Sequence, residues 1–301
     1  MMLVSILMLA QPAQVGAFEL FGIKIFGGDE ETDAEVVDPV PYSAELRVEN
    51  DIPSLSEKLM DGSLLVRKQD QPPSGTIGLI SRARDDESNL LALLFEEAYY
   101  GGTVSTSIGG RRPDQIGVTD TLRLVDGKVP VTVMVSPGPE FRFGDIRLLG
   151  GDPALAQAAA TEGGLVPGDK AASRTIIEAE AAVVRTWQRA GHPFVKIAKR
   201  EVIADHATRQ LDVTLHIAPG PPARIGTARI KGTKRMSPEF LLRQAEVPAG
   251  DPYHPKTMER IRKNLTSLDA LGSVSVKVAE TPGPDGLYPV IIEVSERKRR
   301  T

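Results

Sequence analysis

The sequence repeats itself at a spacing of 82 residues. Segments 131–139 and 213–221 both end in Pro-Gly-Pro, and the match continues in register beyond them. The further matching pairs are Arg142 and Arg224, Gly144 and Gly226, Gly150 and Gly232, Gly168 and Gly250, and Asp169 and Asp251. A period of this length indicates a tandem array of similar small domains rather than one large core.

Each repeat has the periodicities of a β-α-α-β-β unit. Alternation of apolar and polar residues predicts strands, and apolar residues three and four apart predict helices. In the middle repeat we expect strand 143–149, helix 153–161, a helix over 176–190, and strands 194–203 and 211–217. In the last repeat we expect strand 225–230, helix 238–245, a helix over 255–268, and strands 274–279 and 289–294.

A more divergent repeat precedes these two. It is predicted to contain strand 42–48, helix 52–65, a helix ending at Gly101-Gly102, and strands 103–108 and 129–135. An insert around 71–75 is expected to explain its greater length. The fold class is therefore α+β, with three tandem β-α-α-β-β domains.

The ends of the chain differ from the repeats. An apolar run, Leu3–Ala10, followed by small residues up to Ala17 predicts a signal peptide over 1–17, with an ordinary buried strand or helix as the alternative. An acidic linker is expected over 18–40. The domains are expected over 41–137, 140–221 and 222–296, and a basic stub over 297–301.

Charge is distributed unevenly along the chain. Residues 1–50 hold two basic and nine acidic side chains, whereas residues 223–301 hold fifteen basic and nine acidic. This asymmetry favours a basic end placed near something anionic, with an ordinary solvated surface as the alternative.

No catalytic or metal-binding pattern is present in the sequence. There is no cysteine, and the four histidines, His192, His206, His216 and His254, have no ligand spacing. Phosphate-binding, dinucleotide-binding and serine-hydrolase motifs are missing as well. We therefore expect a protein that is not an enzyme and that has no cofactor and no metal.

The repeat unit resembles the POTRA (polypeptide-transport-associated) domain. The resemblance implies that each unit is a small three-stranded mixed sheet covered by two helices. The resemblance covers about residues 40–300 and depends on the Pro-Gly-Pro junctions with their following Arg and Gly, on Ala98-Tyr99-Tyr100-Gly101-Gly102, and on the closing segment 296–301. Three such units behind a signal peptide resemble the periplasmic arm of outer-membrane assembly factors. The autotransporter-assembly type, the outer-membrane subunit of the translocation and assembly module, is the most similar.

This resemblance implies a location and a set of partners. The expected location is the periplasm of a Gram-negative bacterium, associated with the outer membrane. The expected partners are unfolded outer-membrane proteins or autotransporters and an inner-membrane-anchored subunit, with no nucleic acid. Proteins of this kind continue into a membrane β-barrel, which would begin near Thr301. We expect the chain to be a fragment, a truncated product or a stand-alone arm.

Binding is expected at the edges of the sheets. Unpaired backbone groups of an edge strand can hydrogen-bond an added strand with little sequence specificity. The candidate residues for clients or partner are Phe194, Val195, Lys196, Ile197, Val274, Val276, Lys277 and Val278. Alternatively, these strands only complete the fold, and Lys196, Lys199 and Lys277 protect the edge.

The basic end is a second candidate surface. Arg297, Lys298, Arg299 and Arg300 are expected to lie near anionic membrane headgroups. Two functions remain open at this point. The first is a periplasmic client-binding module, and the alternative is a periplasmic scaffold or a secretion or division adaptor that uses the same domains only for docking.

Overall fold

The computed structural model describes residues 19–20, 23–24, 38–50, 52–117 and 120–297. Two compact units are present. The first comprises the chain up to Arg142 together with Lys170–Ser173 and Ala204–Gln210, and the second comprises Phe143–Asp169, Arg174–Ile203 and the chain from Leu211 onward. The predicted signal peptide and most of the predicted acidic linker lie outside the described residues.

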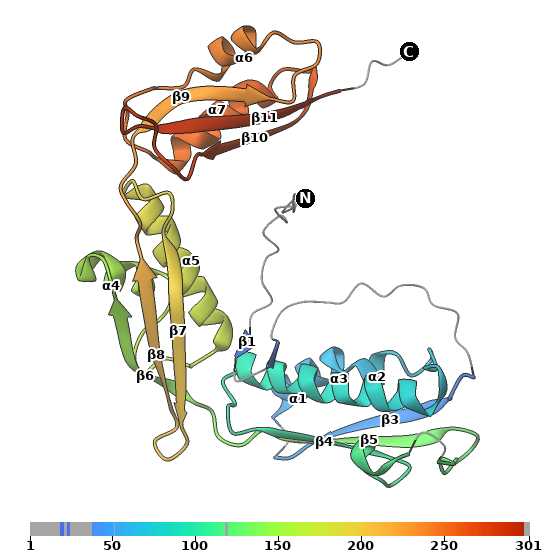
Figure 1. Ribbon diagram of the computed structural model, residues 1–301. Coiled ribbons are helices and arrows are strands. Elements are labelled where there is room, and N and C mark those ends of the chain that lie inside the picture. Colours follow the sequence, from blue (N-terminus) through green and yellow to red (C-terminus); the bar gives the residue numbers. More distant parts are fainter. Residues whose placement is uncertain (1–18, 21–22, 25–37, 51, 118–119, 298–301) are drawn as a thin grey trace, which may run out of the picture. The chain divides into compact units, whose positions relative to one another are not determined.

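The order of elements follows the predicted repeats (Figure 1). A pair of two-residue strands, β1 (Glu19–Leu20) and β2 (Ile23–Lys24), precedes the first repeat. The first repeat contains β3 (Tyr42–Val48), α1 (Pro53–Gly62), α2 (Leu64–Arg67), α3 (Gly75–Glu96), β4 (Thr103–Ile108), the 3-10 helix η1 (Pro113–Gln115) and β5 (Val129–Ser136). The second contains β6 (Arg142–Leu149), α4 (Pro153–Glu162), α5 (Ser173–Arg189), β7 (Lys196–Asp205) and β8 (Gln210–Ala218). The third contains β9 (Ile225–Lys231), α6 (Pro238–Ala245), α7 (Pro255–Thr266), β10 (Leu271–Val278) and β11 (Tyr288–Glu296).

Each repeat forms one three-stranded mixed sheet, as predicted. The strand orders are β3-β5-β4, β6-β8-β7 and β10-β11-β9, so the last strand of every repeat lies in the centre. In the first and third sheets the central strand is parallel to the first strand and antiparallel to the second. Each sheet therefore has two edges, and the second strand of the repeat forms the antiparallel one.

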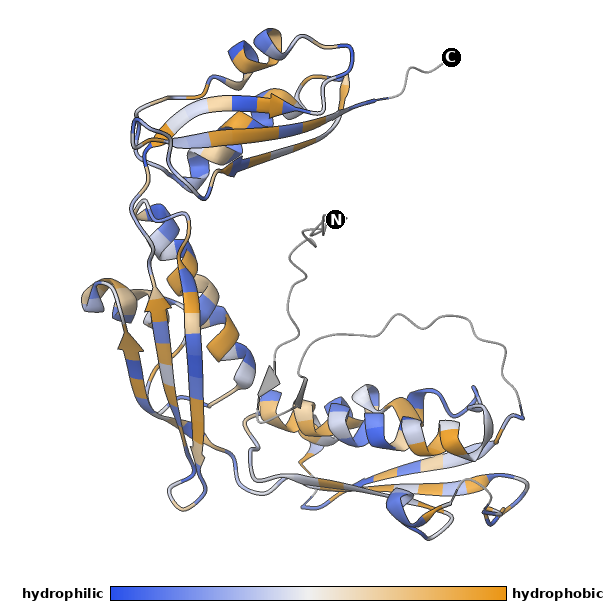
Figure 2. Cartoon of the chain, in the orientation of Figure 1, coloured by the Kyte–Doolittle hydropathy of each residue, from blue (hydrophilic) through white to orange (hydrophobic). Residues whose placement is uncertain are grey.

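The cores lie between the sheets and their helices. Along β5 and β11 every second side chain is buried. Figure 2 shows hydrophobic and hydrophilic residues interleaved along the strands. In the third repeat, the buried residues of β11 pack against Leu241 of α6 and against Met258, Ile261 and Leu265 of α7. The helices thus cover one face of this sheet, and the other face holds polar or half-buried residues.

Two glycines recur at matching positions of the repeats for a structural reason. Gly150 and Gly232 follow the first strands of the second and third repeats, and their φ angles are 97° and 89°. A Cβ atom on Gly150 would lie 2.2 Å from the carbonyl oxygen of Ile217, and one on Gly232 would lie 2.1 Å from that of Val294. Both the positive φ and the close approach of the central strand therefore require glycine.

The first repeat departs from the sequence prediction in three places. The predicted helix 52–65 is broken at Ser63, where buried Asp86 of α3 accepts hydrogen bonds from the Ser63 hydroxyl (2.7 Å) and the Leu64 N–H (2.6 Å). Burial raises the pKa of Asp86. The second departure concerns α3, which ends at Glu96 rather than at Gly101-Gly102 because Ala98 adopts a left-handed conformation with φ of 66°.

The third departure is the origin of the extra length. It does not lie mainly around 71–75. Helix α3 has 22 residues, against 17 in α5 and 12 in α7. The connection between β4 and β5 is also far longer than those between β7 and β8 or between β10 and β11.

Candidate binding edges

Strand β10 presents unpaired backbone groups at the edge of the third sheet. Its neighbour is β11, and the N–H of Ala279, just after β10, donates to the carbonyl of Pro289 at 2.8 Å. Because successive residues of a strand point their backbone groups to opposite sides, Val274, Val276 and Val278 point theirs away from β11. Within the part of the chain that the structure describes, these three N–H groups have no acceptor.

The side chains of these valines face the core of the domain, so only their backbone groups are exposed along the edge. Val274, Val276 and Val278 are half-buried and pack against the core of the third repeat. Ser275 and Lys277 alternate with them and lie on the opposite face of the sheet. The edge therefore offers main-chain donors and acceptors, with side chains of low specificity beside them.

The corresponding edge of the first sheet is closed. Here the N–H of Gly109 donates to Pro130 at 2.8 Å, so Val104, Thr106 and Ile108 are the residues whose backbone groups point outward. The carboxylate of Glu87 accepts the hydrogen bond of the Thr106 N–H at 2.7 Å.

Backbone atoms of the following loop close the rest of this edge. Ile108 and Arg111 exchange two backbone hydrogen bonds, of 2.8 and 3.1 Å. A side chain and a loop thus occupy most of the positions that an added strand would use. This closure distinguishes β4 from β10, although both are the antiparallel edge strands of their repeats.

Strand β7 is the edge of the second sheet, and it begins later than predicted. Lys196 and Ile197 lie in β7, but Phe194 and Val195 precede it. The Phe194 ring lies 5.5 Å from that of Tyr288, and Val195 is buried. These two residues are therefore part of the packing and not of the edge, which corrects their inclusion in the predicted strand.

The last residue of β11, Glu296, holds the segment after β9 through its carboxylate, a contact called the Glu296 clasp below. Glu296, whose side chain is 4% exposed, accepts hydrogen bonds from the backbone N–H groups of Lys234, Arg235 and Met236 at 2.8, 2.8 and 3.0 Å. The Arg235 side chain also donates to it at 2.9 Å. These donors lower the pKa of Glu296 to about 2, with the Arg235 N–H contributing most. Arg297 follows directly, whereas Lys298, Arg299 and Arg300 lie outside the described residues.

The turns before the second and third repeats use the same backbone hydrogen bonds. The N–H of Phe141 donates to Ala98, and the N–H of Ala223 donates to Gly191. The carbonyl groups of Phe141 and Ala223 then accept from Ala171 and Tyr253 at 3.0 and 2.9 Å.

Tyr100 fixes the first of these turns. Its ring lies 5.1 Å from that of Phe95 and 5.6 Å from that of Phe141, and its hydroxyl donates to the carbonyl of Ala171 at 2.7 Å. Burial raises the pKa of this phenol. The Tyr99-Tyr100 segment that carries part of the resemblance is thus a packing element.

The histidines have local contacts. His192 lies 2.9 Å from the carbonyl of Gly220, His206 packs on Phe141, and His254 caps α7. His216 lies 3.7 Å from Glu201. Among the described residues there is no group of three or more possible metal ligands, and no helix is long and apolar enough to cross a membrane.

Glu87, Arg111 and Glu296 are the site residues that sequence patterns did not reveal. Their contacts involve backbone atoms, and those of Glu87 and Glu296 join segments distant in the sequence. No motif marks such contacts, because any carboxylate at the right place would accept the same hydrogen bonds.

Comparisons with known proteins agree with this architecture. Residues 223–297 match the family model POTRA, described as surface antigen variable number repeat. The crystal structure of POTRA domains 3–5 of BamA from Haemophilus influenzae matches with a TM-score of 0.53 and 18% identity, covering 85% of this chain and 96% of that one. POTRA domains 1–3 of the periplasmic domain of Omp85 from Anabaena match with a TM-score of 0.36 and 15% identity, covering 86% and 96%.

No curated protein matches this chain. The strand orders, the helix-covered sheets and the similarity to the Haemophilus domains lead to one statement on the fold. Residues 223–297 are matched by the POTRA family model, and the three repeats together have the fold of tandem POTRA domains.

Proposed function

We propose that this chain is the periplasmic POTRA module of an outer-membrane protein or autotransporter assembly factor. It binds unfolded clients and an inner-membrane-anchored partner by adding their strands to its sheet edges, and it has no catalytic role. The tandem POTRA fold supports this proposal, since the BamA chain from Haemophilus influenzae that shares this fold is a POTRA region. The periplasmic, outer-membrane-associated location is part of the same proposal.

The open edge of β10 is the observation that carries the proposal. An extended client beside Val274, Val276 and Val278 would pair with three outward backbone positions. Each hydrogen bond contributes a net ~1 kcal/mol, so a short added strand binds weakly and reversibly. Main-chain pairing demands little of the client's sequence, as a module for many clients requires.

Photocrosslinking in cells tests this edge. A photoreactive residue at Ser275 or Lys277 would sit beside the open edge without entering the core. On the closed strand β4, the side chains of Ser105 and Ser107 lie on the same face of the sheet as those of Ser275 and Lys277 do on β10. These two serines serve as controls. We expect adducts with unfolded outer-membrane proteins or with the partner subunit from β10 and few from β4. Equal adducts from both strands, or none from β10, would contradict strand addition.

A proline variant separates strand addition from mere proximity. The Val276 N–H points away from β11, so Val276→Pro removes an edge donor while leaving the ladder intact. The Ser275 N–H faces β11, so Ser275→Pro should disrupt the sheet and lower the melting temperature more. If Val276→Pro keeps a near-normal melting temperature and still gives full crosslinking from Lys277, the backbone edge is not the site.

The scaffold alternative predicts a different result. Adducts from β10 would then contain only folded members of a complex, and Val276→Pro would impair complex assembly without affecting insertion of outer-membrane proteins. The closed edge of the first sheet is compatible with such docking, because its surface offers side chains rather than backbone groups.

A further inference from the structure

Helix α7 presents basic side chains that are not used inside the protein. Lys256, Arg260 and Lys263 are exposed, and among the described residues none of them forms an ion pair within 4 Å. Lys263 lies near Glu259, where its charge helps to lower the pKa of that carboxyl. The remaining cation of the helix, Arg262, is neutralised by Glu259 at 2.7 Å. The charges of Lys256 and Arg260 are therefore available to an external anion, and that of Lys263 is offset only in part by Glu259, which pairs with Arg262.

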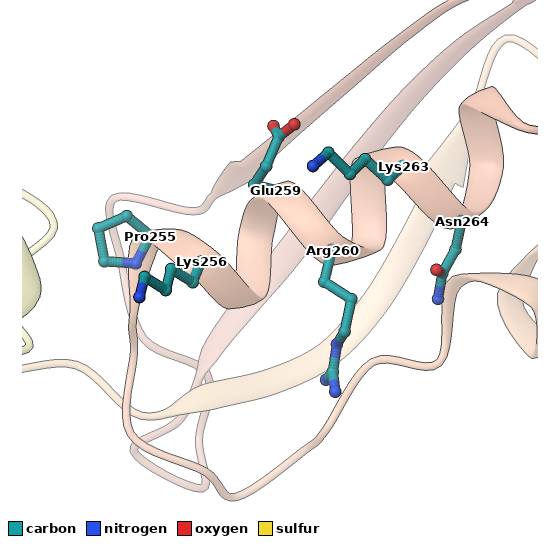
Figure 3. A pocket seen from close by; sticks show the side chains of 6 residues that line it. All are labelled: Pro255, Lys256, Glu259, Arg260, Lys263 and Asn264. Carbon is teal, nitrogen blue, oxygen red and sulfur yellow. The ribbon is translucent and has the colours of Figure 1, made fainter.

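These charges line one shallow groove. Its lining residues are Pro255, Lys256, Glu259, Arg260, Lys263 and Asn264, and its volume is about 540 Å³. Figure 3 shows Arg260 and Asn264 projecting from one side of the helix and Glu259 and Lys263 from the other. At a rise of ~1.5 Å per residue, the three cations extend over ~10 Å of the helix.

The helix holds this face in a fixed position. Met258, Ile261 and Leu265 bury the opposite side of α7, and His254 accepts the Lys256 N–H at 3.1 Å as the N-terminal cap. A cation in the first turn opposes the helix dipole, so Lys256 does not stabilise α7. Helix stability thus does not account for a basic residue at this position.

Arg297 lies beside the other end of α7. The N–H of Arg297 donates to the carbonyl of Ala270, in the turn that follows α7, at 2.8 Å. Residues 298–300 in the sequence are again basic. Arg297, the last described residue, therefore adds a positive charge near the C-terminal end of α7.

We propose that the α7 groove binds the phosphate groups of an anionic phospholipid surface. Guanidinium and ammonium groups both bind phosphate oxygens, and the partner's negative charge complements a face on which only Glu259 is acidic. This proposal is independent of client binding at β10, since α7 contributes no backbone group to that edge.

Vesicle binding by the purified chain tests this proposal. The probes are vesicles of phosphatidylcholine alone and of phosphatidylcholine with phosphatidylglycerol in a roughly two-to-one ratio. The test variant combines Lys256→Gln, Arg260→Gln and Lys263→Gln. Because each basic residue near an anionic surface contributes a several-fold gain in binding, we expect about a 100-fold loss of binding to the anionic vesicles.

A matched variant controls for net charge. Arg229→Gln, Lys231→Gln and Lys234→Gln remove three exposed charges on and after β9, outside the groove. We expect this control to lose only a few-fold in affinity and both variants to keep the wild-type melting temperature. Equal losses in the two variants would show a net-charge effect without a site and would overturn the proposal.

Two further outcomes would also overturn it. The first is a wild-type chain that does not distinguish anionic from neutral vesicles. The second is groove-dependent binding of polyglutamate without vesicle binding, which would assign the groove to an acidic peptide. Crosslinking from Lys277 should be unchanged in the α7 variant, so failure of this proposal is distinguishable from failure of strand addition.

Discussion

The carboxylate of Glu87 accepts a hydrogen bond from the Thr106 N–H at 2.7 Å and so occupies the place of a carbonyl on a neighbouring strand. An acidic side chain from α3 thereby completes the ladder of β4 from outside. The same position on β10 is unoccupied within the described residues. Domains that share the same strand order therefore differ in whether their edge strand can accept another chain.

Removing this carboxylate should loosen the first repeat. We expect Glu87→Ala to lower the free energy of unfolding by about 1–2 kcal/mol, because the Thr106 N–H loses a charged acceptor. Glu87→Gln keeps an acceptor oxygen and should lose less. Urea unfolding measures both values, and amide exchange at Thr106 should accelerate most in the alanine variant. Unchanged exchange there would show that the hydrogen bond does not protect the edge.

The Glu296 clasp should make stability depend on pH in the acid range. The pKa of Glu296 is lowered from 4.5 to about 2, so the unfolded chain binds the proton more readily. Its contribution is complete above a pH of about 5 and is lost as the pH falls toward 2.

The variant Glu296→Gln isolates this dependence. The stability difference between the wild-type protein and Glu296→Gln should increase from pH 2 to about pH 5 and then remain constant. Urea unfolding at several pH values measures it. A difference that does not vary with pH would mean that the clasp does not depend on the charge.

The glycines of the third repeat should differ in their tolerance of a side chain. Gly232 and Gly250 have φ angles of 89° and 91°, but only at Gly232 would an added Cβ atom meet backbone, 2.1 Å from the carbonyl oxygen of Val294. We expect Gly250→Ala to cost about 1 kcal/mol, for the φ angle alone. Gly232→Ala should cost about 3 kcal/mol or more, because the strand must also move. Thermal unfolding measures the stability of both variants. Similar losses of stability would mean that the positive φ angle, and not the contact with Val294, accounts for the whole effect.

Tyr100 should stabilise the first turn through both its ring and its hydroxyl. Tyr100→Phe removes the hydrogen bond to the Ala171 carbonyl and should cost about 1 kcal/mol. Tyr100→Ala also removes the contacts with Phe95 and Phe141 and should cost about 3–5 kcal/mol. Chemical unfolding provides both values. If Tyr100→Phe is as destabilising as Tyr100→Ala, ring packing is not the main contribution.

Spacing and periodicity were sufficient to predict the fold. The 82-residue register predicted a repeated unit, and apolar periodicity, of two in strands and of three and four in helices, gave β3, β4 and α6 their observed bounds. The order of strands within a sheet was beyond such patterns, because it depends on pairing between distant segments. The break at Ser63 was missed for a similar reason, since Asp86 reaches it from another helix.

Less of the candidate site could be predicted. The valines of β10 were identified from their alternation, but whether an edge is open depends on what lies beside it. Glu87 and Arg111 close β4 through backbone contacts that any suitable residue could make. Phe194 was assigned to a strand because it begins a short alternating segment, whereas its ring packs against Tyr288.

The turns at Phe141 and Ala223 are held by main-chain hydrogen bonds, and this has an evolutionary consequence. Their donors and acceptors are independent of residue type, so substitutions leave the pattern intact. Gain or loss of a single residue between Phe143 and Asp169, or between Ile225 and Asp251, would misalign the groups that pair there. Apart from its required glycines and its buried core, such a chain can exchange residues over time, but in these intervals its length is the inherited quantity.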